Sequence, residues 1–197
     1  IWENKPNIKY SNIFDHPIKY AGDDRIKKLI NFKNYLQKKN IDHYLITGLD
    51  NIAWLMNLRA DDILYTPLLY AYLLISRNEK PCLYINKDKI NNQLKAKIEI
   101  HFNINSIKNI ENIFSYIKND EIVGLDFSTT TYYFLTLLEK NNINYKDTEN
   151  ICILSKAVKN QIEQVGAFNA NIRDGISMTR FIYWLKNEVD INSTTEM

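Results

Sequence analysis

The segment from Asp50 to Asp62 carries the residue types and the spacing most suited to chemistry. It reads Asp-Asn-Ile-Ala-Trp-Leu-Met-Asn-Leu-Arg-Ala-Asp-Asp, and its apolar spacing predicts a short helix with Trp54 on the buried side. Arg59 would follow the end of this helix, where the helix dipole favours a cation. The planar guanidinium of Arg59 could also form two hydrogen bonds with a carboxylate. Two interpretations stay open. Physical reasoning favours a structural pair with Asp61 or Asp62 over a group on an exposed rim that binds a ligand.

The remaining polar residues do not indicate a metal site or a catalytic nucleophile. His43 and three nearby aspartates fall in one region, whereas His16 and His101 lie elsewhere in the chain. Catalytic zinc and manganese sites need about three to five converging ligands, usually at recognisable spacing. The sequence has no His-x-x-x-His, Cys-x-x-Cys, Asp-x-Asp or Gly-x-Ser-x-Gly pattern, and neither cysteine has an obvious histidine partner. We therefore predict no catalytic residue and no metal ligand in this chain.

The run Gly124-Leu125-Asp126-Phe127-Ser128-Thr129-Thr130 is similar to the phosphate loop of the actin and sugar-kinase fold. That loop needs a glycine where Ser128 stands here, so that backbone N–H groups can approach a phosphate. The sequence also predicts a helix directly afterwards, where that family turns back in a hairpin. A strand end whose Ser and Thr residues cap the next helix is the favoured interpretation. A nucleotide-binding domain remains the alternative from this motif.

Composition limits the class of partner. The 197 residues are 45% hydrophobic and carry 25 Lys and Arg against 23 Asp and Glu, which gives no electrostatic reason to propose nucleic acid or a membrane. No apolar run is long enough to span a bilayer. Cys82 and Cys152 each lie in a short apolar run, which favours buried reduced thiols and a reducing compartment, with a disulfide left open.

Strands and helices alternate through the middle of the chain, which predicts an α/β fold with a mixed sheet covered by helices on both faces. Asp23 or Asp24 is expected to cap the first helix, and Asp50 the second. The predicted helices are Ile26–Leu36, Asn51–Leu58, one starting at Asp88, Ile107–Ile117 and Thr130–Lys140; the predicted strands are His43–Thr47, Leu68–Ser76, Pro81–Ile85 in a hairpin with it, Ile98–Phe102, Ile122–Asp126 and Ile143–Lys146.

The two ends of the chain differ from this middle part. Residues 1–21 contain Pro6 and Pro17 and no sustained periodicity, so we expect a linker from something upstream. The α/β domain would occupy residues 22–154. Residues 155–197 would then open a second domain with one long helix, Gln161–Val189, whose internal glycines each cost about 1 kcal/mol of helix propensity and suggest close packing.

At several points the chain resembles one enzyme family, the eukaryotic cytosolic-type aminopeptidase P family of Xaa-Pro aminopeptidases. The Asp50–Asp62 segment is similar to the middle domain of that family, and Ile1-Trp2 is similar to the exit from its first domain. The remaining matches are Thr66-Pro67, Tyr70 and Tyr72 in the middle domain, and Ile151–Ile153, Lys156–Asn160, Glu163, Asn169–Asp174, Trp184-Leu185 and Glu188-Val189 at the junction into its catalytic domain.

The resemblance implies a creatinase N-terminal-type fold with a ribonuclease H-like sheet, followed by the first helix of a truncated pita-bread domain. It implies an enzyme that removes the N-terminal residue from peptides with proline in second position, using two metal ions, usually manganese. The metal ligands of the family would lie beyond the position of Met197, so we expect this piece alone to be inactive. A creatinase-like module that only binds or assembles is the alternative.

The same resemblance implies that the piece shapes the entrance of the active site and supports assembly of a cytoplasmic homodimer. Arg59, Asn57 and Asp62 are the candidate residues for substrate access. One position departs from the family, which often has glycine where this chain has Ala60. A positive φ there would strain the loop.

Overall fold

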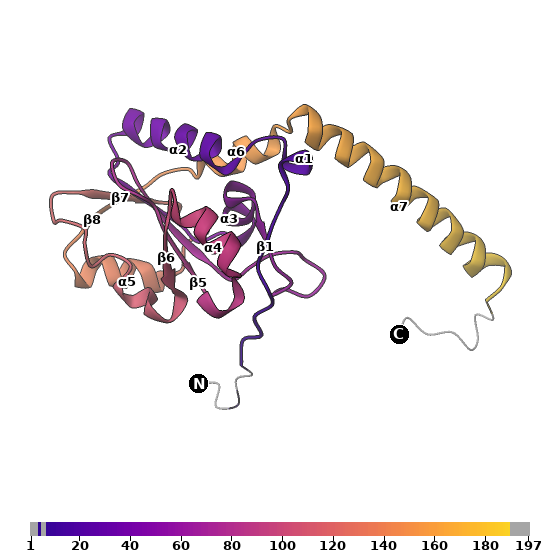
Figure 1. Ribbon diagram of the computed structural model, residues 1–197, viewed down its shortest axis with the longest axis horizontal. Coiled ribbons are helices and arrows are strands. Elements are labelled where there is room, and N and C mark those ends of the chain that lie inside the picture. Colours follow the sequence, from indigo (N-terminus) through magenta and orange to yellow (C-terminus); the bar gives the residue numbers. More distant parts are fainter. Residues whose placement is uncertain (1–3, 5–6, 190–197) are drawn as a thin grey trace. The chain divides into compact units, whose positions relative to one another are not determined.

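The computed structural model describes residues 4 and 7–189 (Figure 1). The chain divides into two compact units, Ile1–Val158 and Lys159–Met197, each of which is described by itself.

A six-stranded mixed sheet forms the centre of the first unit. The antiparallel pairs are β2 with β4 and β4 with β5, and the parallel pairs are β2 with β7, β5 with β6 and β7 with β8. This arrangement confirms both the mixed sheet and the predicted hairpin. The strands lie in the order β6 (Asn103–Ser106), β5 (Cys82–Ile85), β4 (Tyr72–Ser76), β2 (His43–Ile46), β7 (Ile122–Leu125) and β8 (Asn144–Asp147).

Helices cover both faces of the sheet, as predicted (Figure 1). On one face, α2 (Arg25–Lys39) buries Leu29, Phe32 and Leu36, which follow a helical spacing, with α3 (Leu49–Met56), α4 (Asn92–Glu99) and α6 (Ile151–Ala157) beside it. The other face is covered by α5 (Tyr132–Lys140) and by the segment from Ile113 to Ile117. Asp24 caps α2 by accepting a hydrogen bond from the Lys27 N–H at 2.7 Å.

The end of the segment predicted to be a linker lies against this unit. Phe14–Asp15 forms β1, which pairs antiparallel with β3 (Leu58–Arg59), and Ile18–Ala21 forms the short helix α1. Ile13 is buried, and its N–H donates to the carbonyl of Lys89 at 2.7 Å. Residues 13–21 therefore contribute side chains and backbone pairing to the domain core.

Three predicted elements are wrong in place or type. The strand expected at Ile98–Phe102 is the end of helix α4 and a turn, because Leu94 and Ile98 lie one helical turn apart and are both buried. The strand of this region, β6, begins after that turn, at Asn103. The helix expected at Ile107–Ile117 is a 3₁₀ helix, η2 (Ile107–Asn112), followed by turns. The helix expected from Asp88 is split into η1 (Lys87–Lys89) and α4. The predicted cap of α3 is also wrong, because Gly48 rather than Asp50 is its N-cap.

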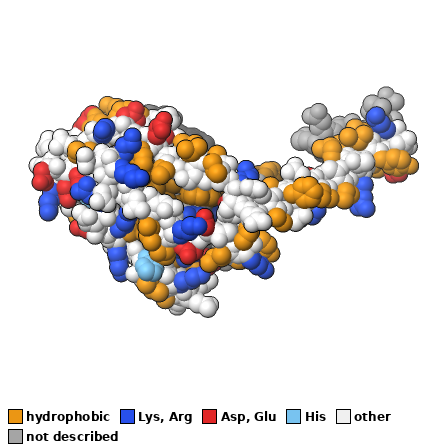
Figure 2. Space-filling view, turned by 90° about the horizontal axis from the view of Figure 1, so that it is seen from above, with side chains coloured by type: hydrophobic (Ala, Val, Ile, Leu, Met, Phe, Trp, Pro, Cys, Tyr) orange, Lys and Arg blue, Asp and Glu red, His pale blue; other side chains and the backbone are white. Residues whose placement is uncertain are grey.

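The second unit contains one helix, α7 (Gln161–Asn187), among its described residues. Asn160 and Glu163 form a capping box at its start. No described side chain of α7 is buried, and Figure 2 shows hydrophobic side chains along it. A Cβ at Gly166 or Gly175 would meet no atom within 4 Å, so the close packing expected at these glycines is not found within the described residues. Within residues 4 and 7–189, no helix has the length and apolar character needed to cross a bilayer.

Candidate functional site

Asn57 and Arg59 lie together at the end of α3. Asn57 is the C-cap, with φ 49° and ψ 43°, a left-handed conformation that asparagine tolerates better than most residues. Its side chain is buried. The Asn57 Oδ1 atom accepts from Lys28 Nζ at 2.7 Å, and Nδ2 donates to the carbonyl of Asp23 at 2.9 Å. Asn57 thus ties the end of α3 to the start of α2.

The Arg59 guanidinium turns back onto the end of the helix. Its Nη1 donates to the carbonyls of Ala53 at 2.5 Å and Leu58 at 2.9 Å, and its partial burial lowers the pKa of the guanidinium. No ion pair joins Arg59 to Asp61 or to Asp62 in the part of the chain that the structure describes. Both of its hydrogen bonds come from Nη1. Among the residues that the structure describes, Nε and Nη2 of Arg59 form no hydrogen bond.

Asp62 belongs to a different group of contacts. One carboxylate oxygen accepts from the N–H and the hydroxyl of Ser11, at 2.6 and 3.0 Å, and the other accepts from the N–H of Tyr70 at 2.9 Å. Asn57 and Arg59 therefore lie together at the helix end. Asp62 instead connects the backbone at Ser11 with the backbone at Tyr70. Ala60 is fully buried and is not among the residues with positive φ, so the strain considered for this position does not arise.

The loop after Asp62 ends in an exposed turn. The Thr66 N–H donates to the carbonyl of Ile63 at 3.1 Å, and Leu64 and Tyr65 form the tip, 77% and 96% exposed. Tyr65 has φ 62°, which is uncommon for a bulky residue. The tip therefore presents two large side chains to solvent from a strained backbone.

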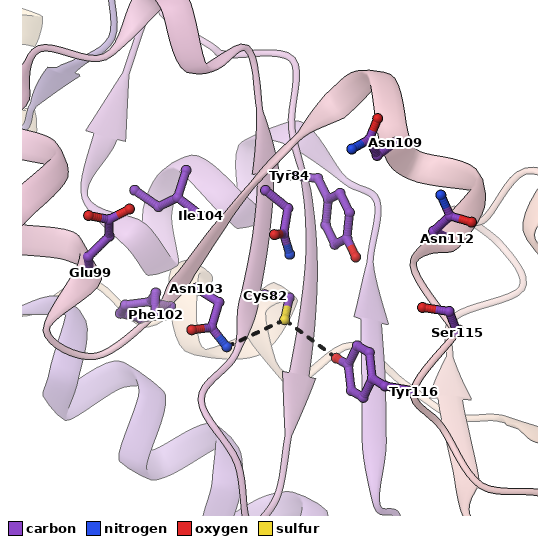
Figure 3. A pocket seen from close by; sticks show the side chains of 11 residues that line it. Cys82, Tyr84, Glu99, Phe102, Asn103, Ile104, Asn109, Asn112, Ser115 and Tyr116 are labelled. Carbon is purple, nitrogen blue, oxygen red and sulfur yellow. Dashed lines mark hydrogen bonds between the residues drawn. The ribbon is translucent and has the colours of Figure 1, made fainter.

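A cleft of about 570 Å³ at β5 and β6 is lined largely by asparagine and tyrosine side chains. In Figure 3, Asn103 and Tyr116 point toward the sulfur of Cys82; Asn103 Nδ2 and Tyr116 Oη donate to it at 3.9 and 3.6 Å. Burial and the neighbouring thiol raise the pKa of Tyr116. The hydrogen-bond donors of this cleft hold the Cys82 thiol. Reasoning from sequence missed this cleft because asparagine is abundant throughout the chain.

The two cysteines confirm the expectation of buried reduced thiols. Both are free and buried. Burial raises the pKa of Cys152 to about 12, so the unreactive thiol form dominates at neutral pH.

His43 and Asp50, two of the residues weighed as metal ligands, contact different partners. His43 Nδ1 lies 2.9 Å from Ser76 Oγ, and its Nε2 lies 3.3 Å from a carboxylate oxygen of Glu121. Asp50 forms an ion pair with Lys156. Among residues 4 and 7–189, no three His, Cys, Asp or Glu side chains converge in a group able to hold a metal ion.

The Asp126–Thr130 loop closes on itself. Asp126 Oδ1 accepts from the N–H and the hydroxyl of Ser128, at 2.9 and 2.5 Å, and the Thr130 N–H donates to the Asp126 carbonyl at 2.9 Å. These N–H groups are thus already used within the turn. The loop leads into α5, whose N-cap, Thr131, makes no side-chain cap bond. Ser128 therefore stabilises the turn rather than capping the helix.

Comparison with known proteins places this architecture in context. Residues 4–163 match the family model described as Creatinase/Prolidase N-terminal domain. Xaa-Pro aminopeptidase 1 of Dictyostelium discoideum is 29% identical over 95% of this chain and 29% of its own length. A probable Xaa-Pro aminopeptidase P of Neosartorya fischeri is 31% identical over 99% of this chain and 31% of its own length.

Among solved structures, the X-prolyl aminopeptidase of Caenorhabditis elegans, a cytosolic enzyme with a di-nuclear active site, matches with a TM-score of 0.79. It is 26% identical, and the match covers 95% of this chain and 31% of that one. The chain therefore spans about a third of the length of these relatives.

Proposed function

Because the chain belongs to the creatinase/prolidase N-terminal domain family, we propose that it is the non-catalytic part of an Xaa-Pro aminopeptidase. The complete protein would remove the N-terminal residue from peptides with proline in second position. The observation that carries this proposal is a likeness to such enzymes over nearly the whole chain, together with coverage of only a third of each enzyme.

The metal chemistry is assigned to a part of the protein beyond the residues described here. The Caenorhabditis elegans relative has a di-nuclear active site. The described residues of this chain do not fit such a site, because no three of their His, Cys, Asp and Glu side chains form a group that could hold a metal ion. We assign two manganese ions, and the hydrolysis itself, to that other part. No catalytic step is assigned to this chain.

In this proposal residues 1–21 lead in from an upstream domain and residues 22–154 form the middle domain, onto which residues 13–21 pack. Residues 155–197 begin the catalytic pita-bread domain. Support for the last assignment comes from α7, whose apolar side chains, among them Phe168 and Trp184, are exposed within the described residues. Exposed side chains of this size are normally covered by another part of a protein.

The role proposed for the middle domain is to shape the active-site entrance and to support assembly of a cytoplasmic homodimer. Arg59 is the principal candidate for substrate access, since both hydrogen bonds that fix it use Nη1 alone. A guanidinium held in this way can still offer donors to a peptide carbonyl or carboxylate. Asn57 and Asp62 would act indirectly. Asn57 would fix the end of α3 before Arg59, and Asp62 would fix the loop after it.

A direct test compares the complete protein with the purified 197-residue chain in an assay of Xaa-Pro peptides, with and without manganese. We expect metal-dependent release of the first residue by the complete protein and none by the chain alone. Activity of the chain alone would refute the assignment of catalysis elsewhere. Inactivity of a folded complete protein with every metal tried would favour the alternative, a creatinase-like module that only binds or assembles.

A further inference from the structure

A second cavity, of about 500 Å³, lies within the first unit where α2 begins. Its walls come from four places in the chain: the β1–α1 segment, the first turn of α2, the end of α3 and the end of α4. None of the residue roles proposed above depends on it. Its volume falls in the range of small-molecule sites, roughly 300–1,000 Å³.

One wall of this cavity holds a buried arginine with an unused donor. The side chain of Arg25 is only 9% exposed, and its Nη2 forms an ion pair with Asp15. Its Nη1 atom is buried and has no hydrogen-bond partner among residues 4 and 7–189. A buried guanidinium donor without an acceptor is costly and rare in folded proteins. An acceptor from another molecule would satisfy this donor.

Two basic side chains and a helix start lie where that acceptor would bind. Lys97 Nζ lies 2.5 Å from the second oxygen of Asp15, so two positive charges face a single carboxylate. The other acid of the wall, Asp24, accepts the N–H of Lys27 as the helix cap and keeps its charge, so the unsatisfied Nη1 donor of Arg25, rather than net charge, favours an anion. The start of the 15-residue helix α2 adds a partial positive charge at the same place.

The remaining walls favour an anion that carries an apolar group. Ile18 and Ile100 line the cavity, and their side chains are 54% and 62% exposed. A ligand that fills the cavity would contact both of them. A phosphate would leave these side chains in contact with water, whereas a carboxylate with a short branched tail would bury them.

We propose that this cavity binds a small carboxylate with a branched apolar tail, the carboxylate on Arg25 Nη1 and Lys97 and the tail on Ile18 and Ile100. Because Nη1 of Arg25 is buried, we expect Lys97, whose side chain is 60% exposed, to move away from Asp15 as the ligand enters. A free organic acid and the C-terminal carboxylate of a peptide share this chemistry. The site does not depend on peptidase activity.

The experiment is a calorimetric titration of the 197-residue chain with isovalerate and with its neutral isostere, isovaleramide. Isovalerate should bind at least about tenfold more tightly, because only the acid forms charge-assisted hydrogen bonds. A tetrapeptide ending in leucine, with a free or an amidated C-terminus, distinguishes the two sources. A free-acid peptide tighter than isovalerate assigns the site to a peptide terminus, and a weaker one assigns it to a small acid. Equal binding of acid and amide, or no binding of any probe, would overturn the proposal.

Two variants locate the ligand. Arg25→Gln should abolish binding of isovalerate in a chain that retains its circular dichroism spectrum, and unchanged affinity in that chain would exclude the site. Ile100→Asp should weaken binding about tenfold by repelling the acid and removing apolar contact. Leu64→Asp, on an exposed loop elsewhere, is the matched control and should bind as the unmodified chain does. If Arg25→Gln does not fold, equal affinities of Ile100→Asp and Leu64→Asp would refute the proposal.

Discussion

The Lys28 ammonium lies 2.7 Å from Oδ1 of Asn57, a residue 29 positions later in the chain. The same ammonium donates to the carbonyl of Trp54 at 2.7 Å and lies 4.3 Å from the centre of that indole ring. One buried cation thus joins α2 to the end of α3. Its partner Asn57 lies two positions before Arg59 in the chain.

Replacing this cation should destabilise the first unit. Lys28→Met keeps the aliphatic stem but leaves the acceptors of Asn57 and Trp54 without their charged donor, so we expect a loss of about 2 kcal/mol in the free energy of unfolding. Lys27→Met is the matched control, because the Lys27 side chain is 62% exposed and its ion pair with Asp23 is screened by water, so the free energy of unfolding should change little. Urea denaturation measures both, and equal losses would contradict a structural role for Lys28.

Substrate access through Arg59 predicts a kinetic effect in the complete enzyme. Arg59→Lys retains a donor for the Ala53 carbonyl but loses the planar fork, so stability should be nearly preserved while KM for Xaa-Pro peptides rises about tenfold. Arg59→Ala should raise KM at least as much, with metal content unchanged in both variants. The exposed Lys38→Ala serves as control. Normal kinetics in the folded fraction, with a lower melting temperature, would leave Arg59 a purely structural role.

The strained tip of the loop predicts an asymmetry between two neighbouring residues. Tyr65 has φ 62°, whereas Leu64 has negative φ, and both are highly exposed. Tyr65→Gly removes a left-handed strain of about 1–2 kcal/mol, which offsets the greater freedom of glycine in the unfolded chain. Leu64→Gly has no such compensation and should lower the free energy of unfolding by about 1 kcal/mol. Chemical denaturation of the two variants tests this, and identical effects would argue against strain at Tyr65.

Burial of Tyr84 predicts a loss of stability in alkaline solution. Burial raises the pKa of its phenol from 10.0 to about 12 in the folded protein. Between these values the unfolded chain releases the proton while the folded chain keeps it, so stability falls as pH rises through this window and is unaffected below it.

Tyr84→Phe should therefore reduce the dependence of unfolding free energy on pH by up to about one proton in this window. Urea unfolding at about pH 9 and about pH 11 measures the slope. The unmodified chain, measured under the same conditions, is the reference. An unaltered slope in Tyr84→Phe would show that this phenol does not contribute.

Amide exchange should separate α7 from the sheet. The helix has no buried residue among those described and contains Gly166 and Gly175, so propensity alone must hold it. We expect its amides in the isolated chain to exchange well before those of β4 and β7, whose residues are largely buried. The amides of α2, a helix packed on the sheet, provide the control. Equal protection of α7 and α2 in the monomer would contradict the domain boundary proposed after residue 154.

Local pattern was sufficient for the sheet centre and for most helices. The apolar runs of β2, β4, β5 and β7 mark buried strands, and the three- and four-residue spacing of α2 marks a helix, because these periodicities follow from backbone geometry alone. The mixed sheet, its hairpin, the buried thiols and the length of α7 to within two residues follow from the same signals.

Tertiary packing decided the identity of short apolar stretches and the partners of polar groups. Ile98 and Phe102 suit a strand by composition, yet both are buried around the end of α4, and β6 begins at Asn103 where it pairs with β5. Asn57 and Asp62 bind groups 29, 34 and 51 positions away. Such partners are set by how the helices and the N-terminal segment pack on the sheet, so the residues beside Asn57 and Asp62 in the chain do not encode them.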